Sequence, residues 1–93
     1  MENRMKRALV VSAHGADWCT RCGGTLIKLV NAGFDITVFV FTYGEHGESG
    51  GFWIKNPTGP IEKCKACRKI EADNAAAIIG IREPRYFDYG DYP

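Results

Sequence analysis

The sequence lacks any long apolar run and has almost no net charge. No segment approaches the ~20 consecutive apolar residues that a membrane-spanning helix needs. The short apolar run after MENRMKR gives way to polar residues instead of a signal-peptide core and cleavage site. Twelve lysines and arginines balance 11 acidic residues, so the net charge of +1 gives no electrostatic reason to expect nucleic acid or an anionic membrane as a partner. We therefore expect a soluble, cytoplasmic protein that acts on a small molecule.

The chain is also short for an enzyme. With 93 residues it lies below the usual size of a complete α/β enzyme domain, and a chain of this length buries only ~60–65% of its unfolded surface. It contains no internal repeat and no low-complexity tract. The length is therefore compatible with a fragment of a larger domain.

The four cysteines form two C-x-x-C pairs, Cys19 with Cys22 and Cys64 with Cys67. Without a secretory signal they are expected to be reduced thiols. Two such pairs can also hold a structural zinc, which would make the chain a small, non-enzymatic four-cysteine binding module. The 41-residue spacer is long for a zinc ribbon, and the second pair lies within a helical pattern, so we treat this as an alternative hypothesis.

Apolar patterning predicts alternating strands and helices. Strands are expected at residues 8–13, 36–41 and 86–88, and helices at residues 23–32 and 60–80, with Gly33 and Gly80 as helix-ending residues. A polar loop is expected at residues 14–22, and a glycine-rich loop at residues 43–60. The order β-α-β-α-β predicts a Rossmann-like parallel sheet. Such sheets bind ligands beyond the carboxyl ends of their strands, where loops begin at His14, Tyr43 and Tyr89.

His14 and Asp17 lie three residues apart in the first of these loops. An imidazole and a carboxylate so close in sequence can bind one ion, and zinc accepts such nitrogen and oxygen ligands at ~2.0–2.2 Å. The H-x-x-D pattern alone is weak, because a histidine and an aspartate at a strand end often serve only as turn and capping residues.

The wider pattern resembles the LmbE/PIG-L family of zinc-dependent deacetylases. The likeness covers essentially the whole chain through the segments 10–17, 23–26, 37–45, 68–71, 79–81 and 86–91. It implies that His14 and Asp17 are two zinc ligands. The family's third ligand lies in the carboxyl-terminal half, and no later histidine of this chain can take its place. We therefore expect residues 1–93 to be the N-terminal part of a single LmbE/PIG-L-like domain, inactive alone.

One position departs from the deacetylase pattern. The family's general base, an aspartate, falls on Ala16, whose methyl group cannot accept a proton, and the motif proline is replaced by Gly15. The segments 14–18, 44–49 and 88–93, together with Trp53, resemble the branch of the family that contains 4-oxalomesaconate hydratases. That resemblance implies addition of water to an unsaturated di- or tricarboxylic acid, with an N-acetyl sugar deacetylase as the alternative.

Five further residues are assigned candidate roles. Glu48 is the first candidate for moving the proton of the attacking water, and Glu45 is the second. Arg21 and Arg68 are candidates for binding substrate carboxylates, and His46 is a third substrate-binding candidate. The alternatives are a helix-surface pair of Arg68 with Glu71, and solvated side chains for the other two. We expect the complete enzyme to be a homo-oligomer.

Overall fold

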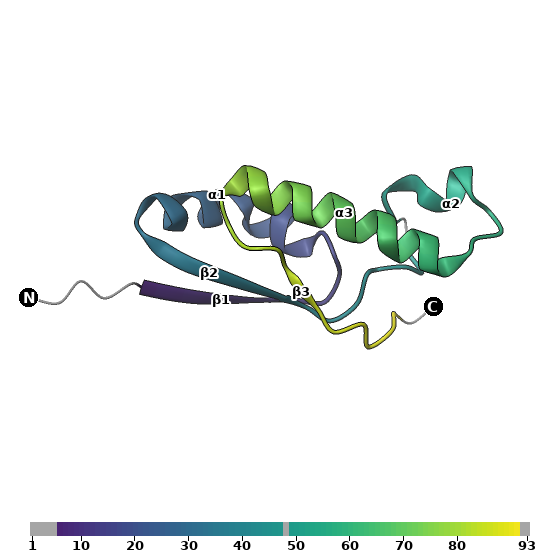
Figure 1. Ribbon diagram of the computed structural model, residues 1–93, viewed down its shortest axis with the longest axis horizontal. Helices are drawn as coiled ribbons and strands as arrows, with labels where there is room; N and C mark the ends of the chain where they lie inside the picture. Colours follow the sequence, from purple (N-terminus) through teal and green to yellow (C-terminus); the bar gives the residue numbers. More distant parts are fainter. Residues whose placement is uncertain (1–5, 48, 92–93) are drawn as a thin grey trace, which may run out of the picture.

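A parallel sheet with helices on one face forms the protein (Figure 1). The computed structural model describes residues 6–47 and 49–91. Its strands are β1 (Lys6–Ser12), β2 (Phe34–Val40) and β3 (Arg85–Tyr86), in the order β1-β2-β3 with both pairings parallel. Helix α1 (Asp17–Asn31) joins the first two strands, and α3 (Ile61–Ile79) precedes the third. The predicted β-α-β-α-β order and parallel sheet are thereby confirmed.

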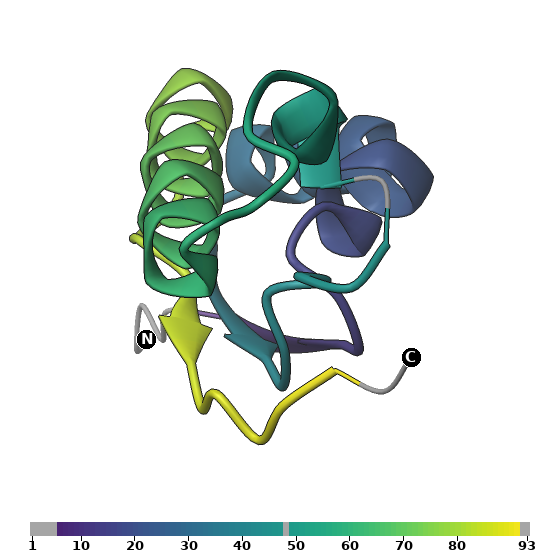
Figure 2. The same ribbon diagram turned by 90° about the vertical axis from the view of Figure 1, so that its right-hand side faces the viewer.

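The hydrophobic core lies between the sheet and the two long helices. Along β2 every second side chain points at the helices, so that Ile36, Val38 and Val40 are almost fully buried. Leu26 of α1 and Ala76 of α3 pack against them. In the end-on view both helices lie on the same side of the sheet (Figure 2). This one-sided covering follows from two successive right-handed crossovers running in the same direction.

The opposite face of the sheet carries exposed apolar side chains. Leu9 and Val11 of β1 are 57% and 56% exposed. Phe39 packs edge-on against Phe87 at a centroid distance of 5.1 Å, and Phe41 lies 5.9 Å from Phe87. No helix of the described residues covers these apolar side chains, because both crossovers pass over the other face of the sheet.

Helix α1 begins earlier than the sequence predicts. The expected loop at residues 14–22 was wrong from Asp17 onward, since the helix starts there and runs through Gly23 and Gly24. The apolar residues Trp18, Cys22 and Leu26 follow one another at four-residue steps and form the face that meets the core. Tertiary packing of this face therefore outweighs the ~1 kcal/mol that each interior glycine costs a helix.

Helix α3 buries small side chains and exposes large ones. Cys64, Ala72 and Ala76 are buried, whereas Ile70 is 61% exposed, and Ala77 is exposed as well. The small residues let the helix approach the sheet and α1 closely, which turns the isoleucines outward. The helix ends at Gly80, whose φ of 95° suits a residue without a side chain, as predicted.

The remaining elements are short. The predicted loop at residues 43–60 contains a 3-10 turn, η1 (Ser49–Gly51), followed by α2 (Phe52–Lys55). Strand β3 is shorter than expected because Asp88 adopts a positive φ of 55°, although Phe87 and Tyr89 still donate backbone hydrogen bonds to the end of β2 and the residue after it. None of the described helices has the length and apolar character required to cross a membrane.

Candidate active site

The carboxyl ends of β1 and β2 bring two loops together. Thr42 donates its hydroxyl to the carbonyl of Ala13 at 2.8 Å, which ties the loop after β2 to the loop after β1. Gly44 then passes close to His14, and a Cβ at this glycine would lie 3.4 Å from the His14 Cβ. Gly44 also has a φ of 67°, so both the backbone conformation and the close approach favour glycine here. The loop after β2 therefore packs against His14 at the carboxyl-terminal edge of the sheet.

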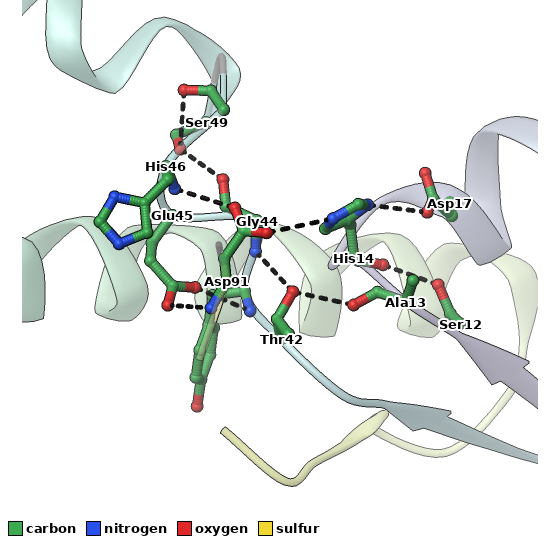
Figure 3. A network of polar contacts seen from close by, with 12 residues as sticks. Ser12, Ala13, His14, Asp17, Thr42, Gly44, Glu45, His46, Ser49 and Asp91 are labelled. Atoms are coloured by element: carbon green, nitrogen blue, oxygen red, sulfur yellow. Dashed lines mark hydrogen bonds and ion pairs between the residues drawn. The ribbon is translucent and has the colours of Figure 1, made fainter. Parts of the chain in front are cut away.

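His14 lies between two carboxylates (Figure 3). Its Nδ1 is 3.3 Å from Asp17 Oδ2, and its Nε2 is 3.3 Å from Asp91 Oδ1. Two ligands of one tetrahedral zinc, each ~2.0–2.1 Å from the metal, lie about 3.3 Å apart. The spacing of His14 and Asp17 therefore fits two ligands of a single ion. Among the described residues, no group of three or more histidine, cysteine, aspartate or glutamate side chains could hold a metal.

Glu45 organises the loop instead of facing the cavity. It is only 2% exposed, and its Oε1 and Oε2 accept the backbone N–H groups of Tyr43 and Asp91 at 3.1 and 2.9 Å. Trp53 donates its indole N–H to the Glu45 carbonyl at 2.7 Å. Because both carboxylate oxygens already accept hydrogen bonds, Glu45 links the loop after β2 to the segment after β3.

Asp91 is the residue on which these contacts converge. Its Oδ2 accepts the backbone N–H of His46 at 3.1 Å, its own N–H donates to Glu45, and its Oδ1 faces His14. From the sequence, Asp88 and Asp91 follow the third strand and are candidates to support the site, with the capping of a turn as the alternative for Asp91. The position of Asp91 beside the imidazole depends on the sheet pairing and could not be read from local spacing.

A cavity of about 200 Å³ opens beside His14. It is lined by His14, Gly15, Ala16, Asp17, Tyr43, Gly44, Gly47, Ser49, Arg68 and Asp91. The predicted metal ligands therefore share one cavity with Arg68. The two remaining substrate-binding candidates, Arg21 and His46, do not line it; Arg21 borders a separate hollow, and the ring of exposed His46 turns away from His14 in Figure 3. Glu48 lies outside the described residues.

Two tyrosines stack beside the site, and one of them, Tyr43, lines the cavity. The rings of Tyr43 and Tyr86 are 4.2 Å apart and nearly parallel. Burial raises the pKa of Tyr86 to about 12, and the neighbouring Tyr43 adds to the effect. The Tyr86 hydroxyl is buried without a hydrogen-bond partner among the described residues, and a Cβ at Gly15 would lie 3.1 Å from it. A proline at position 15 would therefore crowd this hydroxyl.

The cysteines do not assemble a metal site. All four are free thiols, with Cys19 and Cys22 on α1 and Cys64 and Cys67 on α3. The described residues contain no group of three or more cysteine, histidine or acidic side chains suited to a metal. The four-cysteine zinc module is therefore wrong as an account of this fold, because the two pairs lie along helices instead of in facing turns.

Comparison with known proteins decides the family. Residues 9–93 match the PIG-L family model, described as GlcNAc-PI de-N-acetylase. The chain belongs to the PIG-L family. It is 41% identical over its whole length to the 4-oxalmesaconate hydratase of Pseudomonas putida, of which it covers 35%. It is 33% identical over 82 residues to a 1D-myo-inositol 2-acetamido-2-deoxy-alpha-D-glucopyranoside deacetylase of Rhodococcus erythropolis, with 87% of this chain and 28% of that protein covered.

Two solved structures share the fold of this chain. The 4-carboxy-2-hydroxymuconate hydratase GalB from Pseudomonas putida matches with a TM-score of 0.87 and 43% identity, covering 96% of this chain and 36% of GalB. The N,N'-diacetylchitobiose deacetylase of Pyrococcus horikoshii matches with a TM-score of 0.79 over 92% of this chain and 30% of that one. At 23% identity the second likeness concerns the fold alone. The chain thus spans about a third of the length of these relatives.

Proposed function

We propose that the complete enzyme is a zinc-dependent hydratase that adds water to an unsaturated di- or tricarboxylic acid. The observation that carries this proposal is Ala16, which lines the same cavity as His14 and Asp17 at the position where the deacetylase pattern places its general base. The 41% identity to a hydratase, against 33% to a deacetylase, supports the same direction. Because the chain spans about a third of these relatives, the activity is proposed for the whole protein.

Zinc is proposed to bind through His14 and Asp17, with a third ligand from outside this chain. The 3.3 Å separation of the two side chains and their mixture of nitrogen and oxygen donors support the assignment. A bound zinc would supply Lewis-acid polarisation of a substrate oxygen. On this proposal Asp91 faces the ring nitrogen of His14 that does not bind the metal, and so holds the tautomer and the orientation of the ring.

The role of moving the proton of the attacking water is assigned to Glu48, with Glu45 as the second candidate. Both oxygens of Glu45 accept backbone N–H groups, and its side chain is buried, so a role in holding the loop suits it better. Glu48 belongs to the same glycine-rich loop, which follows the carboxyl end of β2. A carboxylate from this loop would approach the substrate from a different side than one at position 16.

Arg68 is proposed to bind a carboxylate of the substrate. Its side chain is 15% exposed and lines the cavity with His14, and its Nη1 donates to Glu71 at 2.8 Å. The helix-surface pair that the sequence offered as an alternative is therefore present, and Arg68 also lines the cavity. Arg21 and His46 are left with weaker support because neither lines this cavity.

Deacetylation of an N-acetyl sugar is the second candidate. It is favoured by the description of the matching family model and by the deacetylase relatives. Both candidates imply a small-molecule substrate. A cytoplasmic location and a homo-oligomeric complete enzyme remain predictions.

The test is to assay a full-length form against 4-oxalomesaconate-type substrates and against N-acetyl sugars. We expect hydration and no deacetylation by the wild type. Ala16→Asp is the informative companion, because it restores a carboxylate at the deacetylase position and is expected to lower hydration. Deacetylation without hydration by the wild type would refute the hydratase proposal and leave the second candidate.

A further inference from the structure

A second cavity lies directly behind the one that contains His14. Its volume is about 180 Å³, and it is lined by Gly15, Ala16, Trp18, Cys19, Thr20, Arg68, Glu71, Ala72 and Ala75. Gly15, Ala16 and Arg68 line both cavities. These three residues therefore form the boundary between the metal-side cavity and the second cavity.

The second cavity has an apolar wall and one ion pair, formed by the partly exposed Arg68 with Glu71. Trp18, Ala72 and Ala75 supply apolar surface, while Arg68 supplies the positive charge. One of its N–H groups is paired with Glu71, but its Nε is buried without a hydrogen-bond partner among the described residues. A buried, unpaired guanidinium N–H is costly, and a carboxylate oxygen is the strongest partner for it.

The boundary residue Ala16 carries no charge and only a methyl group. An aspartate there would put a negative charge at the boundary of both cavities and close to Arg68. It would repel an incoming carboxylate and compete for the guanidinium. The alanine leaves the boundary without a negative charge that would oppose an anionic group approaching Arg68 from the metal side.

We propose that Ala16 is a specificity-determining residue that lets one carboxylate arm of the substrate pass from the metal-side cavity to Arg68 in the second cavity. The methylene part of the arm packs against Trp18 and Ala72. This inference deepens the proposed function and rests on it for the identity of the substrate, a di- or tricarboxylic acid. The absence of the deacetylase aspartate then serves substrate binding as well as the choice of reaction.

The charge at position 16 can be tested with a matched pair of variants. Ala16 is the N-cap of α1, where aspartate and asparagine are both favoured, so Ala16→Asp and Ala16→Asn are expected to fold. The two introduced side chains have nearly the same shape and differ in charge. The probe is glutarate, a saturated dicarboxylate that cannot be hydrated, titrated calorimetrically into the zinc-loaded full-length protein.

We expect Ala16→Asp to weaken glutarate binding at least roughly tenfold relative to Ala16→Asn. Arg68→Gln should weaken it to a similar extent, while Arg82→Gln, at a side chain that pairs with Asp35 and lines neither cavity, should leave it unchanged. Equal affinities of Ala16→Asp and Ala16→Asn would overturn the proposal, and so would wild-type affinity in Arg68→Gln.

A second measurement shows where a carboxylate arm of glutarate binds. Cys19 lines the second cavity, whereas Cys67 lines neither of the two cavities. Glutarate should slow the alkylation of Cys19 by iodoacetamide at least ~3-fold and leave Cys67 unaffected, as followed by mass spectrometry. Equal rates for Cys19 with and without glutarate would overturn the inference.

These readouts do not depend on hydration. If the binding and alkylation results hold while the full-length enzyme shows no hydratase activity, the proposed function is wrong, but the passage of a carboxylate past Ala16 to Arg68 is supported. If hydration occurs while Ala16→Asp and Ala16→Asn bind glutarate equally, only the passage of a carboxylate past Ala16 to Arg68 is refuted.

Discussion

The carboxylate of Asp91 lies 3.3 Å from the Nε2 atom of His14, although the two residues come from opposite ends of the chain. Asp17 occupies the other side of the same ring at 3.3 Å. The imidazole is thus held on both sides, and the backbone of Asp91 is itself fixed by Glu45. This arrangement leads to separate predictions for each carboxylate.

Replacing His14 or Asp17 by alanine in a full-length form should lower zinc occupancy strongly, because each removes one proposed ligand. Replacing all four cysteines by serine should leave occupancy unchanged, since they lie outside the site. Metal analysis of the purified variants measures both effects. Loss of zinc in the cysteine variant with retention in His14→Ala would contradict the assignment.

Asp91→Asn should lower zinc affinity in the full-length form by roughly 10–100-fold, because it weakens the partner of the second ring nitrogen. The backbone N–H of residue 91 remains available to Glu45, so the fold should be retained. Asp88→Asn is the matched control; Asp88 pairs with Lys65 at 2.9 Å and does not contact His14. A competition titration with a zinc chelator compares the two, and similar affinities in both variants would argue against the orienting role.

Glu45→Gln should lower the stability of the protein, whereas Glu48→Gln should lower the rate of hydration. The Glu45 change replaces one of two buried acceptors by an amide group that cannot accept, and should cost about 1–3 kcal/mol of stability. Glu48→Gln should keep the melting temperature and lower the hydration rate by ~10²–10⁴. Thermal unfolding and kcat are measured on both variants; full hydration by Glu48→Gln would remove Glu48 from the mechanism.

Tyr86 should make stability fall at alkaline pH. The pKa of its phenol is raised to about 12, so the folded state keeps its proton where the unfolded chain loses it. The folded state therefore binds more protons between pH 10 and 12, and stability decreases across this interval. With allowance for partial exposure, the loss is of the order of 1 kcal/mol.

Tyr86→Phe should remove part of this pH dependence and leave stability at neutral pH unchanged or raised by about 1 kcal/mol, because the buried hydroxyl has no partner among the described residues. Tyr89→Phe, at a side chain that is 73% exposed, is the control. Urea unfolding at pH 7 and pH 11 compares the two variants. A large loss of stability in Tyr86→Phe at pH 7 would mean that the hydroxyl is hydrogen-bonded.

The sequence by itself determined the features that depend on short-range spacing. The existence of the strand β2 and the glycine that ends α3 were readable because the residue preferences of strands and helix ends are local. The pairing of His14 with Asp17 followed from their three-residue separation in one turn. The start of α1 was missed because Gly23 and Gly24 lower the helical propensity of a segment that only packing against the core makes helical.

Tertiary structure alone decided which distant residues meet. Asp91 reaches His14 and Glu45 because β3 pairs with β2 in a specific register, and nothing in the local sequence encodes that pairing. Arg68 joins the cavity because α3 crosses the sheet with its small residues inward, a packing choice that also exposes Ile70. These contacts depend on crossover direction and close packing, which are properties of the whole chain.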